Sequence, residues 1–240
     1  MGTRNWMFAV LFWGCLGTLI PVSAQIVNQA PGTSLGIDSQ NPTDFPTFRS
    51  QAFDDFTIAA PTFITTFTAY GFDLKYDSGT MTYIPDPSLP TNTGVNAGIY
   101  TTPNATTAPI LSTTGSEDAS RNLNFNFGGA LLAPGTYWVS AWVDRPYGAT
   151  TSRWLWRTYT PVSGSQAIWH NPLNGWGQGG SPQNVGPLVG AGSVDLAYTL
   201  NGFTAASVPE PSTFVLAGAL VLVGTGYGTW RARKRRALKT

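Results

Sequence analysis

The sequence GTYWVSAWVD, residues 135–144, carries the clearest alternation in the chain. Successive side chains of a β-strand point to opposite faces of its sheet, so an extended backbone would sort these residues into two sets. One set is wholly apolar and the other mixes tryptophan with polar residues: Tyr137, Val139, Ala141 and Val143 against Trp138, Ser140, Trp142 and Asp144. The first set is therefore predicted to face a hydrophobic core, and the second to form a partly wet face.

Other strand-like segments lie on both sides of this one. They are rich in Thr, aromatic and β-branched residues, and they span 53–59, 62–76, 98–102, 122–127, 153–159 and 194–201. Turn residues such as Gly128-Gly129 separate them, and no helix-length apolar period occurs. Short strands without intervening helices predict an all-β, antiparallel β-sandwich or jelly-roll-like domain over residues 45–207. Residues 25–44 are expected to form an extended lead into it.

The start of the chain has the layout of a secretory signal peptide. An uncharged apolar run over 6–20 follows a basic residue, and the small residues Val22 and Ala24 occupy the positions that a signal peptidase pocket accepts. We therefore expect signal peptidase to remove residues 1–24 by cutting between Ala24 and Gln25.

The end of the chain, residues 208–240, has three parts in a fixed order. Val208-Pro209-Glu210-Pro211 comes first, and an uncharged, largely apolar segment follows over 213–230. As a helix with about 1.5 Å rise per residue, this segment would reach about 27 Å, close to the thickness of a bilayer core. A basic cluster completes the pattern: Arg231, Arg233, Lys234, Arg235 and Arg236. We expect a transmembrane helix whose basic end stays in the cytoplasm, with the preceding domain on the other side of the membrane.

This ordered tail resembles the PEP-CTERM sorting signal of Gram-negative bacteria. The resemblance rests on Pro209-Glu210-Pro211, the spanning segment and the basic cluster, in that order. It implies recognition by an exosortase-type membrane protease, a membrane-anchored precursor, and export across the inner membrane to the cell surface or the extracellular space. Because exosortase systems are associated with exopolysaccharide, that polymer is a candidate partner. A permanent single-pass anchor is the alternative interpretation.

Several internal segments resemble the β-sandwich passengers that often precede such a tail. They are FDDF at 53–56, LAPGTYWVS at 132–140, WLW at 154–156 and DLAYTLNG at 195–202. This resemblance implies a fold and no activity.

The charge of the chain changes once its two terminal segments are set aside. The whole sequence has a net charge of +1, whereas residues 25–207 hold six Lys and Arg against eleven Asp and Glu, a net charge of −5. Nucleic-acid binding is not expected, because phosphate contacts need clustered Lys and Arg. The sole cysteine, Cys15, falls in the signal peptide, so the exported domain has no disulfide. Bulky Phe12 and Trp13 before Cys15 argue against its lipidation.

The exported segment offers little for catalysis. It has one histidine, His170, in a turn-like WHNP setting, and it lacks the motifs of nucleophile elbows, zinc peptidases, phosphate loops and dinucleotide sites. Adjacent Asp54 and Asp55 would point to opposite faces of a strand, so they do not form the convergent pair that glycoside hydrolysis needs. We expect no enzyme activity and no cofactor, and we interpret His170 as a solvated or hydrogen-bonded loop residue.

Asp54 and Asp55 have an alternative use as Ca²⁺ ligands, together with Asp144 or Asp195. Calcium takes about six to eight oxygens, and no spacing in the sequence supplies them. We therefore expect no metal site, and we interpret both carboxylates as acceptors of backbone amide hydrogen bonds.

Four tryptophans could form a binding face. Trp138 and Trp142 share one side of their strand, and Trp154 and Trp156 share one side of the next. If residues 145–152 close a hairpin that pairs Trp142 with Trp156, all four lie together and could stack on sugar rings. They could equally form a second layer of the core, because tryptophan is usually well buried.

Two functions remain after these exclusions. The leading one is an exported, non-catalytic protein of the cell envelope or extracellular matrix, delivered by the sorting signal. The alternative is a polysaccharide-binding module that uses the tryptophan face.

Overall fold

The computed structural model describes residues 24–32, 34–86, 91–147, 152–205, 227 and 231. The chain divides into two units, Met1–Phe203 and Thr204–Thr240. Residues 1–23, the motif at 208–211, most of the segment at 213–230 and most of the basic cluster lie outside the described residues. Within the described ranges, no helix is long and apolar enough to cross a membrane.

The described elements are almost all strands. They are β1 (Ala24–Gln29), β2 (Gly36–Asp38), β3 (Gln40–Pro42), β4 (Gln51–Ile58), β5 (Thr62–Ala69), β6 (Gly71–Asp77), β7 (Thr82–Pro85), β8 (Gly94–Tyr100), β9 (Leu111–Glu117), β10 (Leu123–Leu132), β11 (Gly135–Arg145), β12 (Ser152–Tyr159), β13 (Ile168–His170), β14 (Gln183–Asn184), β15 (Asp195–Leu196) and β16 (Tyr198–Thr204). The helices are a 3₁₀ turn, η1 (Pro46–Phe48), and a short α1 (Val185–Leu188).

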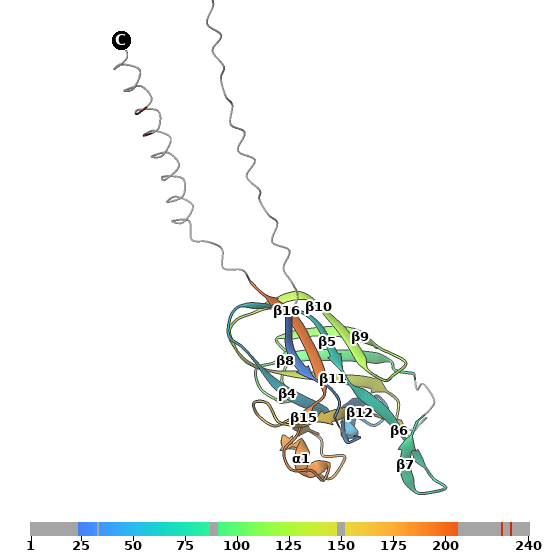
Figure 1. Ribbon diagram of the computed structural model, residues 1–240. Helices are drawn as coiled ribbons and strands as arrows, with labels where there is room; N and C mark the ends of the chain where they lie inside the picture. Colours follow the sequence, from blue (N-terminus) through green and yellow to red (C-terminus); the bar gives the residue numbers. More distant parts are fainter. Residues whose placement is uncertain are drawn as a thin grey trace, which may run out of the picture. The chain divides into compact units, whose positions relative to one another are not determined.

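Two curled sheets contain these strands (Figure 1). The larger sheet has the order β1-β16-β5-β10-β9-β8-β11-β4-β13-β14, with β3 also paired to β11. The smaller sheet has the order β15-β12-β6-β7, with β2 also paired to β12. The described pairs are antiparallel apart from β3 and β11, which run parallel. The described chain is therefore all-β and has the character of a β-sandwich, as predicted.

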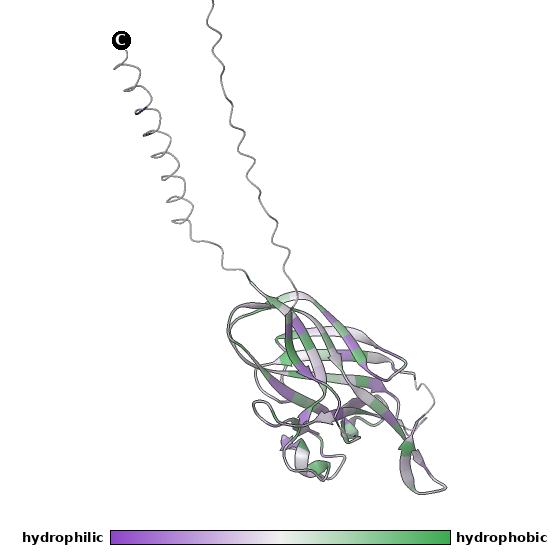
Figure 2. Ribbon diagram, viewed as in Figure 1, coloured by the Kyte–Doolittle hydropathy of each residue, from purple (hydrophilic) through white to green (hydrophobic). Residues whose placement is uncertain are grey.

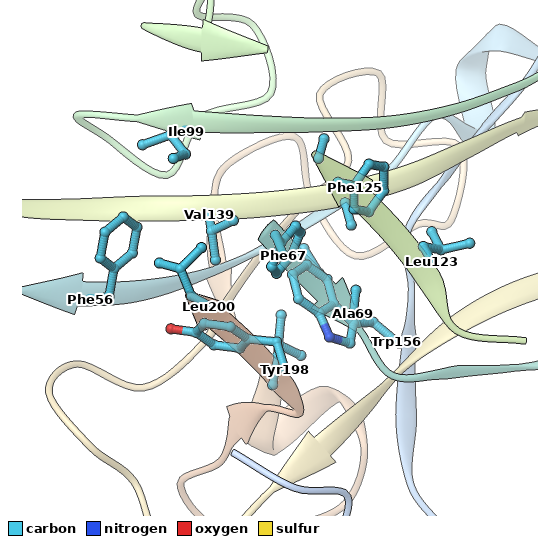
Figure 3. Close-up of a cluster of buried hydrophobic side chains, with 14 of the residues drawn as sticks. Phe56, Phe67, Ala69, Ile99, Leu123, Phe125, Val139, Trp156, Tyr198 and Leu200 are labelled. Carbon is cyan, nitrogen blue, oxygen red and sulfur yellow. The ribbon is translucent and has the colours of Figure 1, made fainter. Parts of the chain in front are cut away.

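The hydrophobic core collects side chains from both sheets. Most come from the larger sheet, and β12 contributes two tryptophans from the smaller one. Phe67 is central: the ring centroids of Phe125, Tyr198 and Trp156 lie 5.4, 5.8 and 5.9 Å from its own (Figure 3). Hydropathy alternates along many strands (Figure 2), as expected where one face of a strand packs on the core. Burial of each large apolar side chain here contributes about 2 to 3 kcal/mol to the free energy of unfolding.

The apolar face of β11 is the one predicted from its sequence, but the opposite face is less exposed than expected, because Ser140 is 0% exposed and its hydroxyl is buried without a partner among the described residues. Val139, Ala141 and Val143 are 0% exposed, and Tyr137 packs at the margin of the core. Tyr137 keeps its hydroxyl outside the apolar region and donates a hydrogen bond to Ala133 O, 2.9 Å away. The sequence therefore predicted correctly which face of β11 packs on the core.

The segment 25–44 is more than an extended lead. β1 pairs with β16, β2 with β12 and β3 with β11, so the segment contributes to both sheets. Several of its polar residues are buried, and Ser39 Oγ, for example, donates to Ala141 O at 2.5 Å. The sandwich therefore begins at β1 and not at residue 45. These strands of three to six residues are too short for an alternating pattern to reveal them.

Two other predicted boundaries were wrong. The single strand expected at 62–76 is divided into β5 and β6, which pair in different sheets. Gly71 starts β6 where a Cβ would collide with the Trp154 indole, so glycine is needed at this passage between sheets. Gly128-Gly129 is a bulge inside β10, where the register with β5 shifts, and not a turn between strands. Both glycines have a positive φ, 68° and 78°, which other residues rarely adopt.

A buried ion pair joins the two sheets where β11 ends. Arg145, 1% exposed, donates from Nη1 to Asp73 Oδ1 of β6 at 2.7 Å. Its Nε also donates to Asn92 Oδ1 at 2.8 Å, and Arg121 Nη1 lies 3.3 Å from the second carboxylate oxygen of Asp73. The end of β11 is thus bound to the opposite sheet, and the next strand, β12, belongs to that sheet.

Candidate functional site: an open groove beside Trp142

The four-tryptophan face does not form. β11 and β12 lie in different sheets, so Trp142 pairs with Asn96 of β8 and Trp156 pairs with Gly71 of β6. Trp154 and Trp156 are 0% exposed, and their indole N–H groups donate to backbone carbonyls at 2.9 and 2.8 Å. These two side chains belong to the core, which the sequence had left open. The hairpin prediction failed because the chain crosses between the sheets at this point.

Trp138 belongs to a second, smaller apolar cluster. It is half-buried and packs with Ile168 around the buried side chains of Phe53, Tyr100 and Ala105. The rings of Phe53 and Tyr100 meet edge to face, with centroids 5.2 Å apart. This cluster lies on the face of β11 opposite to the main core, and it supports the segment 101–110 that follows β8.

An open groove of about 830 Å³ lies beside this cluster; we call it the Trp142 groove. Trp142 of β11, Asn96 of β8 and Thr114 of β9 are register partners and form one row across its floor. The segment after β8 forms a wall. The remaining lining residues are Arg49, Ala97, Tyr100, Ala105, Thr106, Thr107, Ala108, Pro109, Ser112 and Thr113. None of the lining residues is acidic, although residues 25–207 as a whole carry a net charge of −5.

Trp142 and Trp138 are both half-buried, and within the described ranges neither indole N–H has a hydrogen-bond partner. Trp138 packs in the second apolar cluster, whereas Trp142 lines the groove. Four other indoles donate to backbone carbonyls at 2.8 to 2.9 Å: Trp154, Trp156, Trp169 and Trp176. Trp142 therefore presents both a ring face and a hydrogen-bond donor to the groove.

Arg49 supplies the positive charge of the groove. Its Nη2 donates to Ala105 O at 3.0 Å and lies 3.5 Å from Gln51 Oε1, which holds the guanidinium against the wall. No carboxylate pairs with Arg49 among the described residues. A half-buried guanidinium with free N–H groups and no counter-charge is suited to bind an anionic oxygen.

His170 positions the wall of the groove. It is 3% exposed on β13; its Nδ1 accepts the Ala105 N–H at 3.0 Å, and its Nε2 faces Gly180 O at 3.0 Å. The first bond makes Nδ1 the acceptor, so Nε2 carries the proton and donates to Gly180 O. His170 is hydrogen-bonded as expected, but it is a buried strand residue and not a solvated loop residue.

The acidic residues singled out from the sequence bind backbone amides. Asp54 accepts from Asp55 N at 3.0 Å and from Leu196 N at 2.7 Å, and Asp55 accepts from Ser165 N at 2.9 Å. Burial raises the pKa of Asp54 well above its ordinary range, and the nearby Asp195 carboxylate raises it further. Burial also raises the pKa of Asp195, to about 6.

These carboxylates are not arranged around a metal position. The described part of the chain contains no group of His, Cys, Asp and Glu residues that could hold a metal ion. Asp144, the other acid considered for such a site, instead accepts hydrogen bonds from the amide groups of Asn41 at 3.0 Å and Asn96 at 2.8 Å.

A second hollow, of about 430 Å³, already has its polar groups paired. Arg153 Nε donates to Asp38 Oδ2 at 2.5 Å, and the guanidinium carbon lies 4.3 Å from the centre of the Trp176 ring. Trp176 in turn donates to Phe48 O at 2.9 Å. This hollow therefore offers a ligand fewer unsatisfied groups than the Trp142 groove does.

Comparisons with known proteins do not assign a family. No protein-family model and no curated protein matches the sequence. Among solved structures, the chain is similar to the cysteine protease and lectin-like domains of Cwp84, a surface layer associated protein of Clostridium difficile, with a TM-score of 0.38 and 9% identity. The similarity covers 65% of this chain and 32% of that one, so this chain spans about a third of its length. A similarity at this level carries no functional argument.

The expected signal cleavage site lies at the edge of the sandwich. Ala24 and Gln25 are exposed at the start of β1, opposite Gly202 and Asn201 of β16.

Arg49 and Tyr100 were not among the residues selected from the sequence. Tyr100 lies on β8, and Arg49 precedes β4; both strands pair with β11, which brings these two residues to the groove beside Trp142.

Proposed function

We propose that this protein is an exported, non-catalytic component of the cell envelope or extracellular matrix of a Gram-negative bacterium. The observation that carries the proposal is the order of the tail: Val208-Pro209-Glu210-Pro211, the uncharged segment 213–230 and the basic cluster 231–236. In this account signal peptidase removes residues 1–24, the segment 213–230 is a transmembrane helix that anchors the precursor transiently, and an exosortase-type membrane protease then processes the tail. The product is delivered to the cell surface or the extracellular space.

The domain between the two signals supports this proposal as a passenger with a jelly-roll-like arrangement. The single histidine of the exported segment has both ring nitrogens in hydrogen bonds to the backbone. Asp54 and Asp55 likewise accept backbone amides. Residues of the types that most often act as general acids and bases are thus engaged in holding the fold, which favours a role without catalysis.

The sorting proposal can be tested with two variants of the tail. Pro209 and Pro211 disfavour helical geometry at the residues before them, so the motif is expected to be extended and accessible to a protease. Replacement of Pro209-Glu210-Pro211 by three alanines should leave an uncut precursor in the membrane fraction. Replacement of the five basic residues by Gln should instead weaken membrane retention and orientation before any cut. If both variants are processed and fractionate like the wild type, the tail is not a sorting signal.

Polysaccharide binding is a second candidate function. It was first suggested by the four-tryptophan face, and it is now supported by the Trp142 groove. Trp154 and Trp156 no longer support it because they are buried. The Trp142 groove supports it, since an indole free of internal partners lies on its floor. Aromatic rings of this kind stack on the apolar faces of sugar rings, while their N–H groups bind hydroxyls.

A further inference from the structure

We propose that the Trp142 groove binds a polysaccharide whose sugars carry carboxylates, with Trp142 stacking on a sugar ring and Arg49 binding a carboxylate. This inference rests on the second candidate function and names its site and the chemical class of its ligand. Binding in this groove does not depend on the sorting signal, because all the lining residues belong to the sandwich.

The floor of the groove suits a flat, hydroxylated ring. In the row Trp142–Asn96–Thr114, an aromatic face lies next to an amide and a hydroxyl. Along β9, Ser112 and Thr114 are exposed, and their hydroxyls have no partner among the described residues. Other polar groups of the wall are already paired, such as Thr106 Oγ1, which donates to Asn104 Oδ1 at 2.7 Å. The free donors and acceptors are therefore concentrated on the floor beside the indole.

Arg49 adds a preference for negative charge. The domain carries a net charge of −5, yet the only formal charge in the groove lining is that of Arg49. The bonds to Ala105 O and Gln51 Oε1 both use Nη2, and they leave the N–H groups of Nη1 and Nε without a partner among the described residues. A ligand carboxylate can accept charge-assisted hydrogen bonds from these groups, which are stronger than the bonds that an uncharged hydroxyl can accept.

The arrangement of strands disfavours a polypeptide ligand. β8 is paired on one side with β9 and on the other with β11, and β9 is also paired with β10. The floor therefore has no free strand edge to which a peptide could add. One arginine is too little positive charge for nucleic acid, and a floor of amide and hydroxyl groups is too polar for a lipid chain.

The experiment measures binding by the full chain, purified in mild detergent, to oligomers of galacturonic acid. The same oligomers with methyl-esterified carboxyl groups serve as the matched neutral ligand, and poly-glutamate serves as the polyanion without sugar. Variants are Trp142→Ala, Arg49→Gln and the control Arg157→Gln. Arg157 is also half-buried and near a backbone carbonyl (Gly71 O, 3.3 Å), but it packs on Phe72 outside the groove. Thermal unfolding confirms that each variant is folded.

The wild type and Arg157→Gln are expected to bind the acidic oligomer at least about tenfold more tightly than its ester. Trp142→Ala should weaken binding of both sugars about tenfold or more, and Arg49→Gln should make the two affinities equal. Equal affinity of the wild type for acid and ester would overturn the carboxylate preference and leave sugar binding intact. No sugar binding, or folded Trp142→Ala binding like the wild type, would overturn the site and the second candidate function. Equally tight binding of poly-glutamate would reduce the site to a non-specific anion contact and overturn the proposal.

Discussion

At single positions of this domain, burial determines which side chains can be apolar and whether a carboxylate can stay ionised. Val139 is 0% exposed in the middle of β11, and a few residues away on the same strand Trp142 opens onto solvent. The alternation of β11 is the physical reason: neighbouring side chains face different surroundings. The same burial acts on carboxylates, whose charged form is disfavoured away from water.

Val139→Asp should unfold the domain. The variant would place an unpaired carboxylate among apolar side chains, at a cost of about 3 kcal/mol or more. Leu131→Asp is the matched control, because Leu131 is 53% exposed on β10. The measurement is the urea midpoint of both variants. A Val139→Asp domain as stable as Leu131→Asp would show that the faces of β11 were assigned in reverse.

The free energy of unfolding should fall as pH rises from about 4 to 7. The pKa of Asp195 is raised to about 6 in the native domain, so over this window the native state binds more protons than the unfolded state. Asp54, whose pKa is raised well above its ordinary range, contributes with the same sign. Within the described domain, Asp195 Oδ1 is buried without a hydrogen-bond partner, so no donor stabilises the charge on that oxygen.

Asp195→Asn tests the contribution of this carboxyl group. The variant should reduce the loss of stability between pH 4.5 and 7 by about 1 to 2 kcal/mol, because the amide does not titrate. Urea titrations at several pH values provide the measurement. A wild-type domain that becomes more stable over this interval would contradict the assignment.

At the scale of strands and sheets, the sequence was most informative where an element is long and has one face in the core. β11 and β12 were predicted close to their bounds for this reason. β9 reads LSTTGSE and lies largely exposed, so it has no apolar alternation to detect. The partner of a strand is a long-range property, which explains why the tryptophans of β12 were assigned to the wrong sheet and why the groove could not be anticipated.

Arg145→Gln should weaken the connection between the sheets. It would remove the closer of the two cations that pair with buried Asp73 and leave Arg121, and the loss of one partner of a buried pair costs up to about 3 to 5 kcal/mol. Arg157→Gln should cost less than about 1 kcal/mol, because Arg157 is half-buried and has no carboxylate partner among the described residues. Comparable midpoints of thermal unfolding for the two variants would show that Arg145 is not a structural link.

At the scale of the whole molecule, the expected signal cleavage site follows the first residue of β1, and the sorting motif begins in the sequence four residues after the last residue of β16. Removal of residues 1–24 would leave Gln25–Gln29 of β1 in the sheet, and the motif at 208–211 begins only after β16 has ended at Thr204. Both cuts would therefore spare the sandwich. The alternation of a strand and the order of a tail can be read locally in a sequence, whereas a groove built from β8, β9, β11, Arg49 and the segment after β8 depends on the whole fold.

The most direct test of the central claim is the intact mass of the mature protein recovered from fractionated cells. The account predicts a form that begins at Gln25 and ends near Val208–Pro211, found at the cell surface or in the medium. A form that stays in the membrane with Trp230 and Arg236 attached would show that the tail is a permanent anchor, and it would contradict the sorting proposal.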